Sequence, residues 1–230
     1  MVKETPLSGL YPFLHGKAQD QERLEAALLH SVVEKAKESR NAGEAFFSES
    51  AATLVQAAKA LASVYRNGGR LLAMGNGGSS CDAAHVVVEF LHPVTAGRPA
   101  LAAVNLTADI AMMSAIGNDV GFEHVFVRQL VAQAKRGDAL IGVSTSGNSA
   151  NILAAFSKAR EMGLVTIGLT GGDGGRMRSS GLVDHCLVVP THSIHRIQEC
   201  HVAAYHILWD LVHTLLADDR GSASTQGPPR

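Results

Sequence analysis

The sequence lacks an excess of either charge. Its 20 lysine and arginine residues stand against 21 aspartate and glutamate residues, which leaves a formal net charge of -1 at pH 7. Sequence-independent nucleic-acid binding uses a basic excess to neutralise phosphates, and no apolar run here approaches the length of a membrane span. We therefore expect a protein that binds neither nucleic acid nor membrane.

Cysteine is scarce, and a secretory leader is not evident. Cys81, Cys186 and Cys200 form an odd set without CxxC spacing, so we assign them a packing role and no redox role. Near the N-terminus Lys3 is followed at once by Glu4, and no apolar core with a small-residue cleavage site appears. We expect a soluble, cytoplasmic protein.

The length and the apolar content predict one domain. The 230 residues are 46% apolar, enough for one substantial core. Residues 1–19 contain two prolines and two glycines and are interpreted as an extension, whereas 217–230 are polar and rich in Gly, Pro and Ser and are interpreted as a disordered tail. The predicted domain therefore covers residues 20–216.

The apolar pattern is helical in the first part of the chain, and after residue 66 short apolar runs alternate with helical segments. Residues 20–40, starting from a possible N-cap at Asp20, and 44–66 show apolar positions every three or four residues, which predicts two amphipathic helices. Short apolar runs, each predicting a strand, follow at 70–74, 101–106, 139–144, 164–169 and 185–190. Helical patterns separate or follow them at 79–91, 108–116, 123–135, 150–162 and 194–216. This alternation predicts an α/β fold with a parallel sheet.

Two strand-to-helix loops have the composition of phosphate sites. The loop GNGGSS (75–80) combines glycines with Ser79 and Ser80, and STSGNS (144–149) offers four hydroxyls, from Ser144, Thr145, Ser146 and Ser149. Backbone N–H groups at helix N-termini attract anions, and glycine permits their close approach. For either loop alone, a simple turn and helix cap is the favoured interpretation. Without GxGxxG or GxxxxGKS spacing, a small phosphorylated metabolite is favoured over a nucleotide.

Two helices carry candidate metal ligands and proton carriers. His85 and Glu89 are four residues apart, so they share a helix face near the first loop. In 194–216, Gln198 and His206 are roughly 80° apart around the helix and can reach one site. Histidine and carboxylate suit zinc, although a glutamine ligand is unusual. The alternatives are a surface His–Glu pair and a core histidine. Asp109 is equally explained by helix-dipole stabilisation.

Five motifs in this order and spacing resemble the phosphoheptose isomerases of the sugar isomerase (SIS) fold. They are GNGGSSCDAAHVVVE, IGNDVGF, STSGNSANILAA, LTGGDGG and RIQECHVAAYHILWDL, and they span roughly residues 44–216. The resemblance implies a three-layer sandwich with a central five-stranded parallel sheet. It also implies a homotetramer, with the N-terminal helices and the long C-terminal helix in oligomer contacts and with active sites at subunit contacts.

The resemblance also assigns residues to roles. It implies phosphate contacts at Ser79, Ser144, Thr145, Ser146 and Ser149, further substrate contacts at Asn76, Gly77, Glu89, Asp109 and Gln198, and one zinc ion per subunit on His85, Glu89, Gln198 and His206. The presence of this complete ligand set favours an enzyme over the related protein that binds the bacterial replication initiator. One departure is His195, where family members carry an acidic or a small hydroxyl residue.

The implied reaction is an aldose–ketose isomerisation. Sedoheptulose 7-phosphate would give D-glycero-D-manno-heptose 7-phosphate through an enediol, with Glu89 as base and His206 as acid. Two alternatives stay open: a non-catalytic module that senses a sugar phosphate or binds a protein, and an isomerase for another ketose phosphate.

Overall fold

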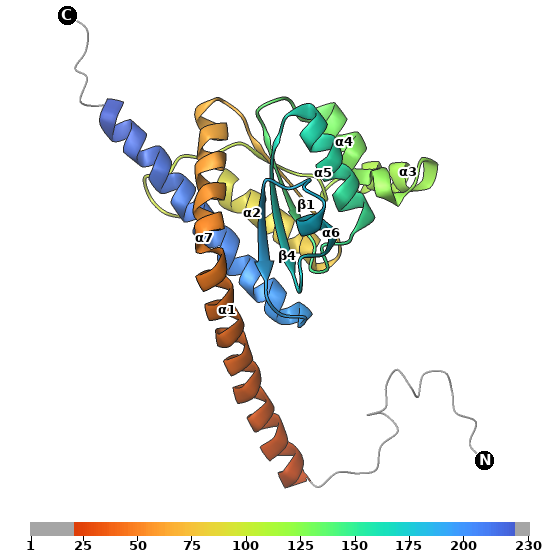
Figure 1. Ribbon diagram of the computed structural model, residues 1–230, viewed down its shortest axis with the longest axis vertical. Helices are drawn as coiled ribbons and strands as arrows, with labels where there is room; N and C mark the ends of the chain where they lie inside the picture. Colours follow the sequence, from red (N-terminus) through yellow and green to blue (C-terminus); the bar gives the residue numbers. More distant parts are fainter. Residues whose placement is uncertain (1–20, 224–230) are drawn as a thin grey trace, which may run out of the picture. The chain divides into compact units, whose positions relative to one another are not determined.

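The computed structural model describes residues 21–223, and the sheet is its organising element (Figure 1). The predicted N-cap Asp20, the extension at 1–19 and residues 224–230 lie outside the described residues. Five strands form one sheet: β1 (Leu71–Gly75), β2 (Ala103–Asn105), β3 (Ala139–Val143), β4 (Val165–Gly171) and β5 (His185–Val189). All five predicted strands are thus confirmed, and every pair of neighbours is parallel.

The order of the strands places two loops next to each other. The order is β2-β1-β3-β4-β5, so the chain moves from β1 to one side for β2 and then to the other side for β3. Gly75, the last residue of β1, pairs with Val143, the last residue of β3. In open parallel sheets such a change of direction is where ligands bind. The loops that follow β1 and β3 therefore begin side by side.

Helices connect the strands and cover both faces of the sheet. They are α1 (Gln21–Arg66), α2 (Gly78–Leu91), α3 (Ile110–Asp119), a 3-10 turn (Phe122–His124), α4 (Val125–Gln133), α5 (Ala150–Met162), α6 (Gly175–Ser179) and α7 (Ile194–Ala223). One core cluster joins the sheet to residues of α2, α7 and the part of α1 after Asn41, and the other joins it to α3, α4, α5 and α6. The predicted three-layer α/β sandwich is confirmed.

Strand β1 shows why both faces need cover. All five of its residues are buried. Leu71 and Ala73 belong to one core cluster, whereas Leu72 and Met74 belong to the other. Because successive side chains in a strand point to opposite faces, a strand that is apolar at every position must be covered on both sides.

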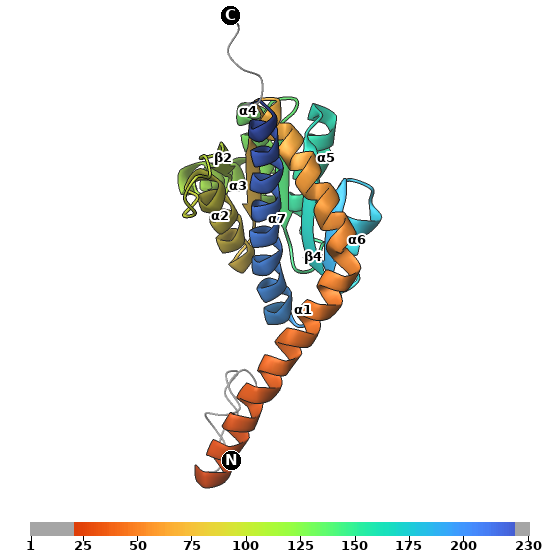
Figure 2. The same ribbon diagram turned by 90° about the vertical axis from the view of Figure 1, so that its left-hand side faces the viewer.

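The helical prediction was wrong in three details. The two predicted N-terminal helices are one helix, α1, because Gly43 lies in a helical interior that contains no proline and tolerates it. The short helix α6 was missed, since five residues are too few for a periodic signal. Helix α7 continues to Ala223, so the beginning of the predicted tail at 217–223 is helical. A hydrogen bond of 3.2 Å from the Arg66 guanidinium to the Leu215 carbonyl joins the C-terminal end of α1 to α7, and these two segments are neighbours in Figure 2.

Among residues 21–223, no helix is long and apolar enough to cross a membrane.

Candidate active site

The loops after β1 and β3 are joined by a pair of asparagines. The side-chain amide of Asn76 donates to Asn151 Oδ1 and the amide of Asn151 donates back to Asn76 Oδ1, each at 2.9 Å. Asn151 lies in the first turn of α5 and is buried. The sequence analysis selected Asn76 but missed Asn151, whose position two residues after STSGNS was the available signal. Side-chain hydrogen bonds thus tie the first predicted phosphate loop to the helix that follows the second.

The first loop depends on glycine to turn tightly onto α2. Gly77 has φ of +53°, and a Cβ on Gly75 would lie 2.1 Å from the carbonyl oxygen of Ser79. The Ser79 N–H donates to the Asn76 carbonyl at 3.0 Å, which closes the turn. No side chain caps the N-terminus of α2. Because the first N–H groups of a helix have no partner within the helix, this end is suited to an anion.

The second loop gathers hydroxyls at the N-terminus of α5. The hydroxyls of Ser144 and Ser149 lie 3.0 Å apart, and Ser149 is the N-cap residue without a side-chain cap bond. Gly147 has φ of +64°, and a Cβ there would lie 2.1 Å from the Gly174 carbonyl oxygen. The loop is therefore held against the segment after β4.

A pocket of about 300 Å³ opens beside this second loop. The predicted residues Thr145 and Ser146 line it, together with Asn148, Asp173 and His192. Asp173 lies in the motif LTGGDGG but was not selected as a site residue, and His192 lies in none of the five motifs. Asp173 accepts a hydrogen bond from the Gly175 N–H at 2.9 Å. The pocket has both polar and apolar lining residues and lies at the carboxyl ends of β3 and β4, the position expected for a ligand in this fold class.

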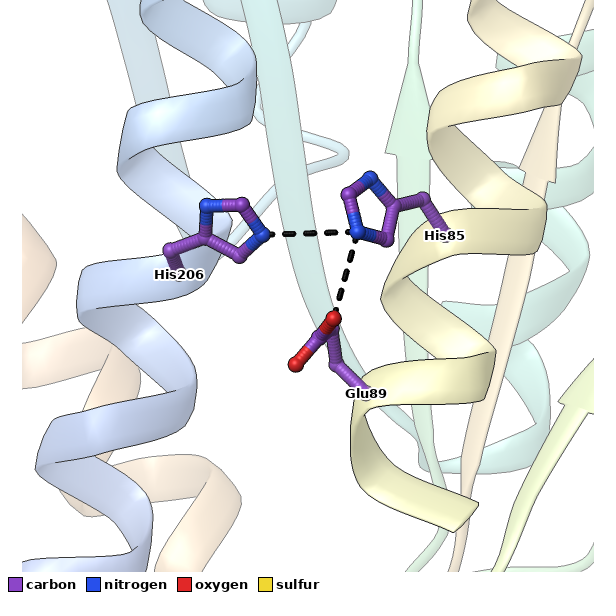
Figure 3. Close-up of side chains that lie close together, drawn as sticks. All are labelled: His85, Glu89 and His206. Atoms are coloured by element: carbon purple, nitrogen blue, oxygen red, sulfur yellow. Dashed lines mark hydrogen bonds and ion pairs between the residues drawn. The ribbon is translucent and has the colours of Figure 1, made fainter. Parts of the chain in front are cut away.

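Three of the four predicted metal ligands converge between α2 and α7 (Figure 3). Nε2 of His85 lies 3.2 Å from Oε1 of Glu89 and 3.4 Å from Nε2 of His206. One ligand atom from each residue lies within 4.8 Å of the others, and all three residues are half-buried. The i, i+4 spacing puts His85 and Glu89 on one face of α2, and α7 brings His206 to that face.

The chemistry of this donor set fits a zinc ion. Two imidazoles and a carboxylate are ligand types that zinc accepts. Both neighbours meet His85 at the same nitrogen, Nε2. A single N–H has one proton to donate, whereas a cation can be shared by all three groups.

Two further polar residues surround His85, and the sequence reasoning missed both. The hydroxyl of Tyr205 lies 2.7 Å from Nδ1 of His85. Burial raises the pKa of Tyr205, and the carboxylates of Asp82 and Glu89 raise it further, so the phenol keeps its proton. Burial also raises the pKa of Asp82 to about 6, although nearby His85 opposes the shift.

Three further residues from the sequence analysis, Gln198, Asp109 and His195, lie at or near the starts of helices. The Gln198 amide lies against the start of α2, where a Cβ on Gly78 would be 2.4 Å from its Nε2. Asp109 caps α3 by accepting from the Met112 N–H at 2.8 Å, which agrees with the helix-terminus interpretation. His195 is exposed in the first turn of α7. The substrate and metal roles of Gln198 and Asp109 stay predictions.

Comparison with known proteins decides the family. The SIS domain family matches residues 36–171. A phosphoheptose isomerase of Desulfovibrio desulfuricans is 42% identical over 192 residues, which cover 83% of this chain and 90% of the relative. The chain belongs to the phosphoheptose isomerase family. As expected from the five motifs, it is therefore a sugar isomerase of the SIS fold.

Further relatives and solved structures agree with this membership. A phosphoheptose isomerase of Aneurinibacillus thermoaerophilus is 47% identical over 149 residues, which cover 65% of this chain and 74% of the relative. The structure of a phosphoheptose isomerase from Francisella tularensis superposes with a TM-score of 0.77 at 34% identity, over 81% of this chain and 98% of that one. The Neisseria gonorrhoeae enzyme gives a TM-score of 0.75 at 40% identity, over 80% and 99% of the two chains.

Proposed function

We propose that the protein converts sedoheptulose 7-phosphate to D-glycero-D-manno-heptose 7-phosphate. The observation that carries this proposal is the convergence of His85, Glu89 and His206, two of them on the helix that follows the glycine loop. A carboxylate and an imidazole are the groups that proton transfer between neighbouring carbons requires. The relatives' shared name supplies the class of substrate, a heptose phosphate.

In this proposal the second loop, residues 144–149, binds the phosphate. Ser144 and Ser149 present hydroxyls, and the uncapped N-termini of α2 and α5 present N–H groups with partial positive charge. Neither loop contains a lysine, so hydroxyls and amides make the contacts. Asn76, Gly77, Ser79, Asp109 and Gln198 contribute further substrate contacts. Fixing the phosphate end orients the sugar so that its reacting carbons face Glu89.

The proton moves between two carbons through Glu89 and His206. One carboxylate oxygen of Glu89, Oε1, already faces His85. The second oxygen is thus the one that removes the proton from the hydroxymethyl carbon next to the ketone and returns it to the neighbouring carbon of the enediol. His206 donates a proton to the carbonyl oxygen as the enediol forms, and it takes back the proton of the terminal hydroxyl as that group becomes the aldehyde. Because one Glu89 oxygen serves as ligand and the other accepts the proton, this residue can act both as ligand and as base.

The proposed cofactor is one zinc ion per subunit, held by His85, Glu89, Gln198 and His206. When bound, zinc supplies Lewis-acid polarisation of the substrate carbonyl. The structural support is the donor set of His85, Glu89 and His206. Gln198 completes the set by resemblance.

The proposed assembly is a homotetramer with its sites at subunit contacts. Helices α2 and α7, which carry His85, Glu89 and His206, also expose apolar side chains. These are Val88 at 51%, Leu91 at 47% and Ile207 at 39%. The His85 side chain is itself 40% exposed. A second copy that covered these surfaces would bury apolar area and shield the site from water. Sedimentation equilibrium of the purified chain tests this, and a monomer at micromolar concentration would contradict it.

The reaction is tested by following sedoheptulose 7-phosphate with the purified protein by NMR. We expect the aldoheptose phosphate to form with zinc and to stop forming after chelation, with recovery when zinc is restored. Product formed equally after complete chelation would contradict the zinc proposal alone. Binding of the sugar phosphate without product would indicate a sensing module or an isomerase for a different ketose phosphate, and a panel of ketose phosphates separates these two outcomes.

A further inference from the structure

Both ring nitrogens of His85 are engaged by other side chains. Nε2 faces Glu89 and His206, and Nδ1 faces the hydroxyl of Tyr205 at 2.7 Å. Tyr205 is only 1% exposed, and its ring packs edge-on against His85 with centroids 5.2 Å apart. The hydroxyl is therefore held in place by the core and has little freedom to turn away.

The proton of a neutral imidazole resides on one nitrogen at a time. When Nε2 donates to the Glu89 carboxylate, Nδ1 has only a lone pair and must accept, so the Tyr205 O–H donates to it. When Nε2 uses its lone pair to bind a metal, the proton resides on Nδ1, which then donates to the phenolic oxygen. A carboxylate or a backbone carbonyl would satisfy only the second arrangement, because it can only accept. A hydroxyl satisfies both.

We propose that Tyr205 is a positioning residue that keeps the His85 ring oriented in both tautomers and so strengthens metal binding at Nε2. This inference rests on the proposed metal site and extends it to a residue of the hydrophobic core. Tyr205 touches neither the substrate nor the metal in this scheme, and it acts only through His85. Partners of this kind around metal-bound histidines typically contribute 10-fold to 100-fold in affinity.

The chain contains a matched control for this hydroxyl. Tyr65 is also a largely buried tyrosine on the same side of the sheet, stacked on Phe90, and its hydroxyl has no hydrogen-bond partner among the described residues. Tyr65→Phe and Tyr205→Phe therefore each remove one buried oxygen and leave the ring. Only the second removes a bond to a proposed ligand.

The experiment measures the zinc affinity of the full chain by competition with a chromophoric chelator. We expect Tyr205→Phe to bind zinc about 10-fold to 100-fold more weakly than the wild type, and Tyr65→Phe to match the wild type. Circular dichroism and thermal melting establish that each variant is folded. Equal affinities for the wild type and Tyr205→Phe, or an equal loss in Tyr65→Phe, would overturn the inference while leaving the metal site intact. A wild-type chain that binds no zinc would overturn the metal proposal and this inference with it.

A second measurement needs no variant at the tyrosine. Two-bond ¹H–¹⁵N correlation spectra of ¹⁵N-histidine-labelled protein distinguish the tautomers of His85, which is assigned by loss of its signals in His85→Asn. We expect the Nε2–H form without zinc and the Nδ1–H form with zinc. The same tautomer in both states would overturn the inference even if Tyr205→Phe weakens zinc binding.

Discussion

The indole of Trp209 donates a hydrogen bond of 2.8 Å to the backbone carbonyl of Glu89. Glu89 lies in the last turn of α2, where carbonyls have no partner within the helix. The guanidinium of Arg98 lies 4.4 Å from the centre of the Trp209 ring and also pairs with Asp210. Trp209, a residue of α7, thus fixes the backbone of Glu89, the proposed base.

Replacing Trp209 with phenylalanine tests this support. The phenyl ring fills part of the space but cannot donate to the Glu89 carbonyl and binds the Arg98 cation less strongly. We expect a loss of about 1–2 kcal/mol in the free energy of unfolding, measured by urea denaturation followed by far-UV circular dichroism. As a control, Asp210→Asn removes the ion pair to Arg98 from its exposed carboxylate side and should change stability by less than about 1 kcal/mol. Equal losses of unfolding free energy in the two variants would show that the indole hydrogen bond adds no stability beyond that of the ion pair.

The role of Glu89 as base predicts a separation of catalysis from binding. Glu89→Gln keeps the size of the side chain but cannot accept the substrate proton, so turnover should fall by roughly 10²-fold to 10⁴-fold. Sugar-phosphate binding, measured by calorimetry, should persist because the serine loops are untouched. Glu161→Gln is the control, since this exposed carboxylate pairs with Lys158 one turn away on the surface of α5. A Glu89→Gln enzyme with near-normal turnover would remove Glu89 from the role.

The second loop should not tolerate a side chain at Gly147. Its φ of +64° is unfavourable for L-residues, and a Cβ would lie 2.1 Å from the Gly174 carbonyl oxygen, which is backbone and cannot easily move aside. We expect Gly147→Ala to weaken binding of the sugar phosphate and to lower stability by about 1–3 kcal/mol. Calorimetry and urea denaturation measure the two effects.

Gly43 provides the opposite case. It lies inside α1, and a Cβ there would meet nothing within 4 Å. Gly43→Ala should therefore stabilise the protein by up to about 1 kcal/mol, because alanine loses less backbone entropy in a helix. If both glycine variants destabilised equally, the close approach of Gly147 to Gly174 would not be the cause.

Buried His201 predicts a loss of stability in mild acid. The ring is fully buried and its Nε2 lies 3.1 Å from the Thr170 carbonyl oxygen. Burial lowers the His201 pKa from 6.5 to about 4, although the bond to Thr170 opposes the shift. Between these values the unfolded chain binds the proton and the folded chain does not, so this contribution is complete above pH 6.5 and is lost as the pH falls toward 4. The loss amounts to about 3 kcal/mol.

A variant comparison isolates this contribution. The raised pKa of Asp82 acts in the opposite direction, because between pH 6 and 3.8 its folded form binds the proton more readily. The useful quantity is thus the difference between the wild type and His201→Gln, whose amide can still donate to Thr170. We expect the variant to lose less stability between pH 6.5 and 4 in urea denaturation. His124→Gln, at a half-exposed position, should follow the wild type. Parallel pH curves for His201→Gln and the wild type would contradict the assignment.

Local sequence pattern was enough to locate most of the secondary structure. The five strands were predicted because each is a short apolar run between turn residues, and a fully buried strand such as β1 has no other composition. The boundary predicted between residues 40 and 44 was wrong because one glycine weakens a helix by only about 1 kcal/mol and does not end it. The helical stretch 217–223 was missed for a related reason, since its polar residues continue a helix that has already begun.

Part of the candidate site could be predicted from short stretches of sequence, and part depends on contacts between residues that are far apart in the chain. The two loops and the His85–Glu89 pair each lie within a few residues of sequence, so their composition and spacing are visible without a structure. Asn151, Tyr205 and Trp209 were missed because their significance depends on partners 75 to 120 residues away.

The sequence by itself determined the α/β class, the two phosphate-loop candidates and, through five ordered motifs, the family. Only the tertiary structure decided which polar groups meet: the Asn76–Asn151 pair, the approach of His206 to His85 and Glu89, and the tyrosine behind the histidine ring. The physical reason is the range of the interactions involved. Periodicity and turn chemistry act over a few residues, whereas the order of strands in the sheet and the packing of α7 on α2 bring together side chains that are remote in the chain.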